Sequence, residues 1–497
     1  MSIESSAVGA LDGATRRGAA IQPRIAWLRG LVVAAGISAS VLFVVIGLGY
    51  ELQLYADGSI FSYAVAVQDA WAFHWHNISG RLFVYLFCYL PAETYVGLTG
   101  DARGGIDIYG LLFFGSQAMG LAATYAADRS QGRIIFCAAC ISVAGLCPLV
   151  FGYPTEMWMA HALFWPTLAV CHYARQGIGG TTMVSAALTA LVFTHEGAIV
   201  FAAAIMATLL LRGTQDFAFR RAAAALLGVM AAWALVKTSL RPDANFSSIL
   251  VSVALNSIDI NNFTCGLFKL LAVTLAGYGG AYLAFRRLTS ANNAQATAVA
   301  LVAVALSAYW LWFDHALHAD NRYYLRTALL VGTPILGAVA MFRALNAEGR
   351  LNFPLPFLSQ IKALMARDPS GPAVGALCLV LLVHGMETSK FITAWKGYKS
   401  AVQSLAMGAD SNPTLGDARF VSATRVVSAL DRLSWPSTTP YLSVLVAPAF
   451  APKRLVVDPR ANYFWTSCET AAANASAERA VPADGRLLIR SHACLRR

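Results

Sequence analysis

Long apolar runs recur along this chain of 497 residues, and they constrain its fold more than any other feature. The first run, at residues 31–49, reads LVVAAGISASVLFVVIGLG and contains no charged residue. An α-helix rises about 1.5 Å per residue, so a run of this length crosses the roughly 30 Å hydrocarbon core of a bilayer. It is also too long for a signal-peptide core. With a mean hydropathy of +0.57, the repeated runs predict an all-α polytopic membrane protein.

The apolar segments predict about eleven transmembrane helices. They lie near residues 31–50, 106–126, 133–152, 157–174, 181–193, 198–212, 222–240, 263–285, 295–313, 326–344 and 372–391. One further segment, residues 82–98, is left out because Pro91 and Glu93 interrupt it after nine apolar residues. We expect this segment to form an interfacial or re-entrant helix.

Residues 181–212 form one apolar stretch with His195, Glu196 and Gly197 near its middle. A single straight helix would place Glu196 near the bilayer centre, at a cost of roughly 2.5 to 3.5 kcal/mol on insertion scales. Two short helices that turn at the sequence Thr-His-Glu-Gly avoid this cost. We therefore expect the turn to lie at the membrane surface.

Basic residues fall in short clusters between the apolar runs, and no aromatic-interleaved basic stripe occurs, so the net charge of +11 does not indicate nucleic-acid binding. With the helices placed as above, most clusters lie on one side, as the positive-inside rule requires. These clusters are the N-terminus, Arg129 with Arg133, Arg175, Arg212 with Arg220 and Arg221, Arg286 with Arg287, and the 345–370 loop. The pattern predicts a cytoplasmic N-terminus. The Ala-rich and Arg-rich composition favours a bacterial inner (cytoplasmic) membrane.

Two domains are expected. Residues 1–391 form a multi-pass transmembrane domain with a long outer loop at 51–105, and residues 392–497 form a small C-terminal periplasmic α/β domain. The runs YLSVLVAPAF and KRLVVDPRANYFW suggest strands in the second domain. Cys468 and Cys494 lie there, and they form a plausible disulfide if the domain faces an oxidising compartment. The other seven cysteines lie in apolar runs, where a thiol packs as a small hydrophobe.

Ionisable residues gather on the predicted outer face, at the ends of helices. The candidate site residues are Asp57, Asp69, Arg81, Glu156, His195, Glu196, His315, His318, Arg322 and Arg326. Arg322 and Arg326 are four residues apart, so they share a face if the helix begins there. Two guanidiniums on one face suit a phosphate held at headgroup depth.

Each candidate also has a plainer explanation. An acidic residue after a first helix is usually a solvated loop residue, and Arg81 could serve as an interfacial anchor. His195 and Glu196 could simply be wet in an exposed turn. His74 and His76 have the His-x-His spacing of a metal site, but no third ligand is in view and the neighbouring aromatics indicate an interfacial helix. A divalent metal is therefore compatible with the sequence but not indicated by it.

The order of these features resembles the GT-C superfamily of integral-membrane glycosyltransferases. The resemblance covers the topology of residues 25–395: a basic N-terminus, one helix, and a long outer loop that opens with an acidic residue in YADGSIF. Further along are tight turns with acidic residues, YPTE and THEG, then RYYLR at a helix start and a C-terminal extracytoplasmic domain. Many GT-C members have an acidic pair in the first outer loop, whereas here Asp57 is followed by Gly58.

The resemblance implies a function and assigns residues to it. The sugar donor would be a polyprenyl-phosphate lipid, the acceptor a glycan or a lipid, and no cofactor would be required. Asp57 would be the general base that takes a proton from the acceptor hydroxyl, with inversion at the anomeric carbon, and Asp69 is the second choice. Arginine or histidine side chains near the departing phosphate would stabilise its charge.

Two other classes remain as alternatives. A transporter or flippase would also need polar residues that face a cavity, but transporters tend to place them at the bilayer midplane and to show two related halves. An O-antigen polymerase or ligase is also polytopic and lipid-linked, but it would have its large loop late in the chain. Here the charges lie at one surface and the long loop follows the first helix.

Overall fold

The computed structural model describes most of the chain. The residues outside the description are 1–3, 77, 147–154, 240–243, 352–369, 409–418, 427–429, 431–432, 434–435, 458–484, 486–487 and 490–497, and for residues 4–26, 76, 244–250, 370, 425 and 436 only the backbone is described. Cys468 and Cys494, the expected disulfide, therefore lie outside the described residues.

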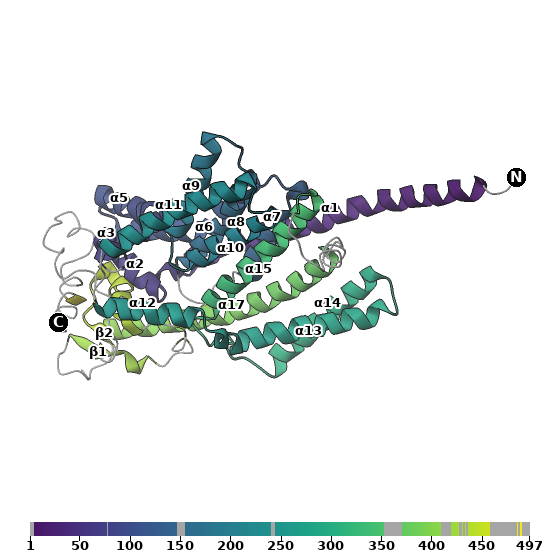
Figure 1. The fold of residues 1–497 in the computed structure, drawn as a ribbon. Helices are drawn as coiled ribbons and strands as arrows, with labels where there is room; N and C mark the ends of the chain where they lie inside the picture. Colours follow the sequence, from purple (N-terminus) through teal and green to yellow (C-terminus); the bar gives the residue numbers. More distant parts are fainter. Residues whose placement is uncertain are drawn as a thin grey trace.

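Long helices dominate the described chain and lie side by side in a bundle (Figure 1). They are α1 Glu4–Gly49, α6 Ala102–Ala127, α7 Ile134–Leu146, α8 Met157–Tyr173, α9 Ile178–Val192, α10 Ala198–Leu210, α11 Phe217–Ser239, α13 Gly266–Arg286, α14 Ala291–Trp312, α15 Tyr324–Ala347 and α17 Ser370–Ala406. Each of the eleven predicted segments coincides with one of these helices. Among the described residues, eight helices are long and apolar enough to cross a membrane. The chain is therefore a helical polytopic membrane protein.

The segment that begins at Leu82 was expected to form an interfacial or re-entrant helix, and it is helical. It is helical without a break from Leu82 to Thr99, as α4 Leu82–Val84, a π-helical turn at Tyr85–Tyr89 and α5 Leu90–Thr99. Pro91 lies at the start of α5, directly after the wider turn, where the missing amide hydrogen does not break the helix. By length and composition this segment is one of the eight that could cross a membrane.

The remaining helices lie in the loops that were predicted on the outer side, and they are short. The first loop contains α2 Asp57–Ala66 and α3 Ala70–His76, after a single 3-10 turn at Leu52–Leu54. The segment between α11 and α13 contains another helix, α12 Ala244–Ser257, which is not among the predicted helices. In Figure 1, α2, α3, α5 and α12 lie at the end of the bundle away from the N-terminus.

The last helix extends beyond the expected domain boundary at 391. α17 continues to Ala406, because the aromatic and aliphatic side chains after Lys390, among them Phe391 and Trp395, are buried on the same helix. The described part of the C-terminal region has a parallel pair of strands, β1 Phe420–Ser422 and β2 Leu455–Val457, and the helix α18 Thr439–Leu445. The strand expected in KRLVVDPRANYFW is thus confirmed at residues 455–457. The strand expected in YLSVLVAPAF is wrong, since residues 441–445 are helical.

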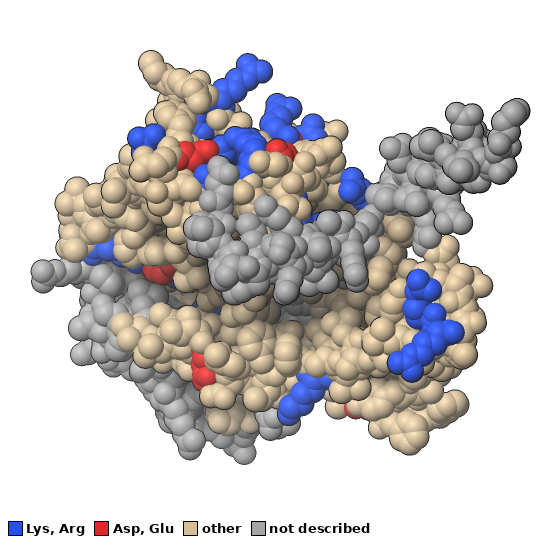
Figure 2. Space-filling view, turned by 45° about the vertical axis from the view of Figure 1, so that its right-hand side comes forward, with Lys and Arg blue, Asp and Glu red and all other residues tan. Residues whose placement is uncertain are grey.

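The basic ends of the helices meet at the other end of the bundle. Arg221 donates a hydrogen bond to the carbonyl oxygen of Arg175 at 2.8 Å, which joins the start of α11 to the loop after α8. The hydroxyl of Tyr173 donates to Glu348 Oε1 at 2.7 Å, which joins the ends of α8 and α15. Figure 2 brings this end forward and shows several patches of Lys and Arg with few acidic atoms. The bundle therefore has one basic end and an opposite end that carries the short helices. We call the latter the outer end, after the side that the sequence predicts for it.

Candidate functional site

The site begins where the chain leaves α1. The backbone turns sharply at Glu51, which has φ +55°, and again at Ala56, which has φ +48° and ψ −124°. Both are left-handed conformations that non-glycine residues rarely adopt. The second turn places Asp57 as the first residue of α2, and α2 is buried from Gly58 to Ala66. The Asp57 carboxylate is therefore fixed to the bundle and does not belong to a free loop.

Asp57 faces Arg326, which lies in the first turn of α15. Arg326 Nη2 is 3.5 Å from Asp57 Oδ2, and the two side chains are 6% and 17% exposed, respectively. Among the described residues, the other carboxylate oxygen, Oδ1, is buried without a hydrogen-bond partner. Burial raises the pKa of Asp57 to about 7, although Arg326 opposes the rise. The carboxyl group therefore titrates near neutral pH.

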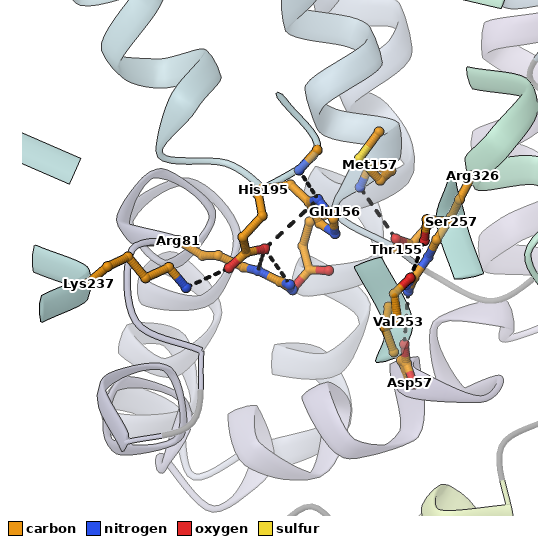
Figure 3. Close-up of polar contacts among 12 residues, drawn as sticks. Asp57, Arg81, Thr155, Glu156, Met157, His195, Lys237, Val253, Ser257 and Arg326 are labelled. Atoms are coloured by element: carbon orange, nitrogen blue, oxygen red, sulfur yellow. Dashed lines mark hydrogen bonds and ion pairs between the residues drawn. The ribbon is translucent and has the colours of Figure 1, made fainter. Parts of the chain in front are cut away.

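A second group of charges lies beside this pair and is centred on Arg81 (Figure 3). Its guanidinium makes ion pairs with Glu156 at 3.0 Å and with Glu196 at 2.8 Å. Lys237 Nζ contacts the other oxygen of Glu196 at 2.6 Å. These four side chains come from the loop before α4, the turn before α8, the turn between α9 and α10, and the end of α11. The ion pairs thus tie four separate segments together at the outer end of the bundle.

The charges of this group are stabilised by one another. Burial disfavours the charged form of Arg81, but Glu156 and Glu196 outweigh it and raise the pKa of Arg81 above its ordinary value. For Glu196, burial alone would raise the pKa, yet the positive charges of Arg81 and Lys237 hold it well below the usual range. Glu196 and Arg81 are therefore both ionised across the physiological pH range. Glu156 and Arg81 also act on the pKa of Asp57, in opposite directions, so the two groups form one electrostatic cluster.

The turn between α9 and α10 is the one predicted at Thr-His-Glu-Gly. His195 Nδ1 accepts a hydrogen bond from the amide of Gly197 at 2.9 Å, which closes the turn. Gly197 is required there because an added Cβ would lie only 2.7 Å from Met157 Sδ and 3.2 Å from a methyl group of Leu330. Burial first, and then Arg81, hold the pKa of His195 well below its ordinary value. The imidazole is therefore neutral, and its hydrogen bond stabilises the turn.

The two arginines of RYYLR were expected to share a helical face, and they do not. α15 begins at Tyr324, so Arg326 is in the helix while Arg322 precedes it. Arg322 lines a shallow polar pocket of about 220 Å³ together with Asp320 and Asn321. It still lowers the pKa of Asp57, which shows that it lies within electrostatic range of that carboxylate. One arginine therefore contacts Asp57 and the other lines the adjoining pocket.

The two histidines before α15 lie outside this cluster. His315 is exposed. His318 is held between two carboxylates, with Nδ1 2.8 Å from Glu387 Oε1 and Nε2 2.6 Å from Asp314 Oδ2. The hydrogen bond to Glu387 raises the pKa of His318, which burial opposes. His318 therefore fastens the loop before α15 to α17.

The remaining candidates of the first outer loop are also apart from Asp57. Asp69 is buried at the turn between α2 and α3, and its backbone carbonyl accepts from the amide of Phe73 at 2.9 Å. The His74 ring lies 4.7 Å from the Tyr89 ring and stacks on Phe61, and burial lowers its pKa to about 3. Within the described part of the chain, no three His, Cys, Asp or Glu residues converge as a metal site would require.

Sequence reasoning missed two members of the site. Lys237 was predicted only as part of a transmembrane helix. Its position in the last turn of an apolar run, at the end predicted to face outward, could have indicated that it belongs to the site. α12 was not among the predicted helices, and the carbonyl of its last residue, Ser257, accepts a hydrogen bond from the hydroxyl of Thr327, the residue after Arg326. Figure 3 shows Val253 and Ser257 beside Asp57 and Arg326. The comparisons find no match, either to a protein-family model or to a curated protein.

The described cluster can do three things chemically. A carboxylate that titrates near pH 7 and has an oxygen without a hydrogen-bond partner among the described residues can accept a proton. Arg326 and Arg322 can compensate negative charge on a phosphate. The ion pairs around Arg81 connect the segments that surround Asp57 and the two arginines, and they can hold these side chains in fixed positions.

Proposed function

We propose that this protein is an integral-membrane glycosyltransferase that moves a sugar from a polyprenyl-phosphate donor to an acceptor hydroxyl at the extracytoplasmic face. The observation that carries the proposal is the buried pair of Asp57 and Arg326, 3.5 Å apart at the outer end of the bundle. The resemblance of the chain's topology to GT-C enzymes supports it. We also propose that the membrane is a bacterial inner membrane and that the basic end faces the cytoplasm.

In the proposed reaction, Asp57 takes the proton of the acceptor hydroxyl as its oxygen attacks the anomeric carbon. A bond forms between that oxygen and carbon, and the bond from the carbon to the phosphate oxygen breaks, with inversion. The electron pair leaves with the lipid phosphate. A pKa near 7 suits this role, because a substantial fraction of the base is ionised at neutral pH and that form accepts a proton readily.

Arg326 has two tasks in the proposed reaction. In the unloaded site it neutralises the Asp57 carboxylate, and when the donor is bound it stabilises the charge that develops on the departing phosphate. Arg322 adds a second positive charge from the polar pocket beside it. Arg322 lies in the loop before α15 and Arg326 lies in the first turn of α15, so one continuous segment would recognise the phosphate.

Arg81, Glu156, Glu196 and Lys237 are positioning residues in this proposal. Their ion pairs of 2.6 to 3.0 Å connect segments that are far apart in sequence. Such a connection keeps the base and the arginines within the narrow geometric tolerance that group transfer needs. It also leaves the cluster at one end of the helices, which favours an enzyme of the membrane surface over a transporter with a midplane site.

The test is transfer from radiolabelled polyprenyl-phosphate sugars by the purified full-length protein in liposomes. Asp57→Asn should lower the rate by about 10²-fold to 10⁴-fold, which is the usual contribution of a general base. The matched control is Asp107→Asn, which removes an exposed carboxylate from α6 at the same end of the bundle and should leave the rate near wild type.

Two results would overturn the proposal. Transfer that is equal in Asp57→Asn and wild type would remove Asp57 from the mechanism. Substrate-dependent flux across the liposome membrane without any covalent product would instead support a transporter or flippase.

A further inference from the structure

The basic end of the bundle contains a pocket that the proposed reaction does not use. It has a volume of about 140 Å³ and lies between α1, α7 and α15, with Ala373 of α17 at its edge. Arg29 and Arg343 line it, from α1 and α15 respectively. Arg29 is near the start of the apolar part of α1, Trp27–Gly49, whereas Asp57 follows the end of that helix. The pocket is therefore at the opposite end of the bundle from the candidate site.

The charge of this pocket is positive. Among the described residues that line it, Arg29 and Arg343 are the charged ones and none is acidic. Asp128, which precedes the turn before α7, acts electrostatically on the lining residue Cys137. Asp128 is already engaged, since its two oxygens accept from the amides of Ser130 at 2.7 Å and of Phe136 at 2.9 Å.

The turn between α6 and α7 is shaped around one of these arginines. Gly132 has φ +69°, and a Cβ at this position would lie 2.6 Å from Arg29 Nη1. Any other residue would be strained in this conformation and would also push the guanidinium away. Glycine at this turn thus leaves room for Arg29 at the pocket.

The walls of the pocket are apolar. Val32, Ile141 and Leu336 line it between helices long or apolar enough to be in the membrane. A free inorganic phosphate would gain little from such walls, whereas a lipid could place its phosphate at the arginines and the start of an acyl chain against the aliphatic side chains. Basic pockets between transmembrane helices on the cytoplasmic side are the kind that bind anionic lipid headgroups.

We infer that this pocket binds an anionic phospholipid of the leaflet at the basic end, with its phosphate held by Arg29 and Arg343. Arginine suits this role because its planar guanidinium donates two parallel hydrogen bonds to phosphate oxygens. The inference is independent of the glycosyltransferase proposal. It rests on the charge and the walls of the pocket alone.

Native mass spectrometry of the delipidated full-length protein tests the inference with phosphatidylglycerol and phosphatidylcholine as probes. Wild type should bind phosphatidylglycerol in preference to phosphatidylcholine. The double variant Arg29→Gln/Arg343→Gln should bind phosphatidylglycerol roughly 30-fold more weakly, since each basic residue near an anionic lipid contributes about a factor of five.

Arg286→Gln/Arg287→Gln is the matched control. It removes two arginines from the end of α13, at the basic end but outside the pocket, and should change the affinity little. An equal loss in the control would show general attraction of anionic lipid to a basic surface and would overturn the inference. Equal binding of the two lipids by wild type would also overturn it.

Ala138→Leu provides a second variant that keeps both arginines. Ala138 lines the pocket, so the larger side chain should occupy part of the volume and weaken phosphatidylglycerol binding by about tenfold. Binding unchanged by this variant would place the lipid elsewhere. Thermal stabilisation by inorganic phosphate alone, equal to that by phosphatidylglycerol, would show that the ligand is the ion and would contradict a lipid site.

Discussion

Two charged clusters lie at the outer end of the bundle, and they differ in how completely their carboxylates are satisfied. Around His318, Glu387 Oε1 accepts from the His318 ring at 2.8 Å and from Lys390 at 3.1 Å, while Oε2 accepts from the His318 amide at 2.8 Å. The oxygens of Asp314 accept from the Tyr309 hydroxyl and from the Ala316 amide, each at 2.8 Å. Every carboxylate oxygen in this cluster has a partner.

The Asp57 cluster is less complete. Arg326 approaches one oxygen of Asp57 at 3.5 Å, and the other is buried without a hydrogen bond among the described residues. The pKa values diverge accordingly, because burial raises that of Asp57 to about 7. For Asp314, burial is opposed by the hydrogen bonds from Ala316 and Tyr309 and by the neighbouring cations, which together lower its pKa. A satisfied cluster fixes a structure, while an unsatisfied carboxylate remains available to a substrate.

The largest expected effect is on catalysis at the incomplete cluster. Arg326→Gln should lower the transfer rate by about 10³-fold, because the variant loses the charge that stabilises the departing phosphate. Arg326→Lys should recover part of the rate, since the positive charge remains while the planar fork is lost. The rates are measured with the labelled lipid-linked donor. A transfer rate of Arg326→Gln within threefold of wild type would show that Arg326 only neutralises the charge of Asp57 and does not stabilise the departing phosphate.

Removing a charge from the His318 cluster, whose carboxylates are all satisfied, should lower the stability of the protein. Glu387→Gln leaves His318 and Lys390 facing a neutral amide in a fully buried position and should lower the free energy of unfolding by about 3 kcal/mol. The measurement is thermal unfolding in detergent, with Asp107→Asn as the control from the exposed surface. If Glu387→Gln instead kept its stability and lost transfer activity, the His318 cluster would belong to the reaction and the contrast between the clusters would fail.

The pH dependence of transfer is the next largest effect. A base must be unprotonated to act, so the rate should fall about tenfold for each unit of pH below 7 and level off above it. The sign follows from the raised pKa, because a carboxyl that titrates near 7 still holds its proton at pH values where an exposed aspartate has lost it. The measurement is kcat/KM from pH 5 to 9.

Arg326→Gln sharpens this test. Arg326 lowers the pKa of Asp57, so its removal should move the acid limb of the residual activity to higher pH. An acid limb near pH 4 in wild type would contradict the assignment of Asp57 as the base.

The sequence predicted the helices because apolar length alone specifies a membrane span, and each expected segment is helical. It also predicted that Asp57 and Arg326 would be at the same end, since the distribution of basic residues determines the side of every loop. The sequence did not predict which charges pair. Lys237 and Glu196 are 41 residues apart, and their contact depends on how α10 and α11 pack.

The errors have physical causes of the same kind. Arg322 and Arg326 were expected on one helical face, but the turn at Asn321, whose side chain accepts from the amide of Tyr323 at 2.8 Å, delays the start of α15. The segment at 82–98 was left out of the transmembrane helices because Pro91 and Glu93 interrupt its apolar run, but a π-helical turn before Pro91 keeps it helical from Leu82 to Thr99. Local hydrogen bonds determine the helix geometry in both segments, and they cannot be predicted from the pattern of apolar residues.

The smallest expected effect concerns the backbone that carries Asp57. Ala56 has φ +48° and ψ −124°, a conformation that glycine adopts without steric cost. Ala56→Gly should therefore keep the turn and change the free energy of unfolding by less than about 1 kcal/mol, since the relief of strain offsets the greater chain entropy of glycine. Ala64→Gly, inside the buried helix α2, has no strain to relieve and should destabilise by about 1 kcal/mol or more. Both are measured by thermal unfolding. An Ala56→Gly loss as large as that of Ala64→Gly would show that the turn stores no strain, and the rigid placement of Asp57 would then depend on the packing of α2 alone.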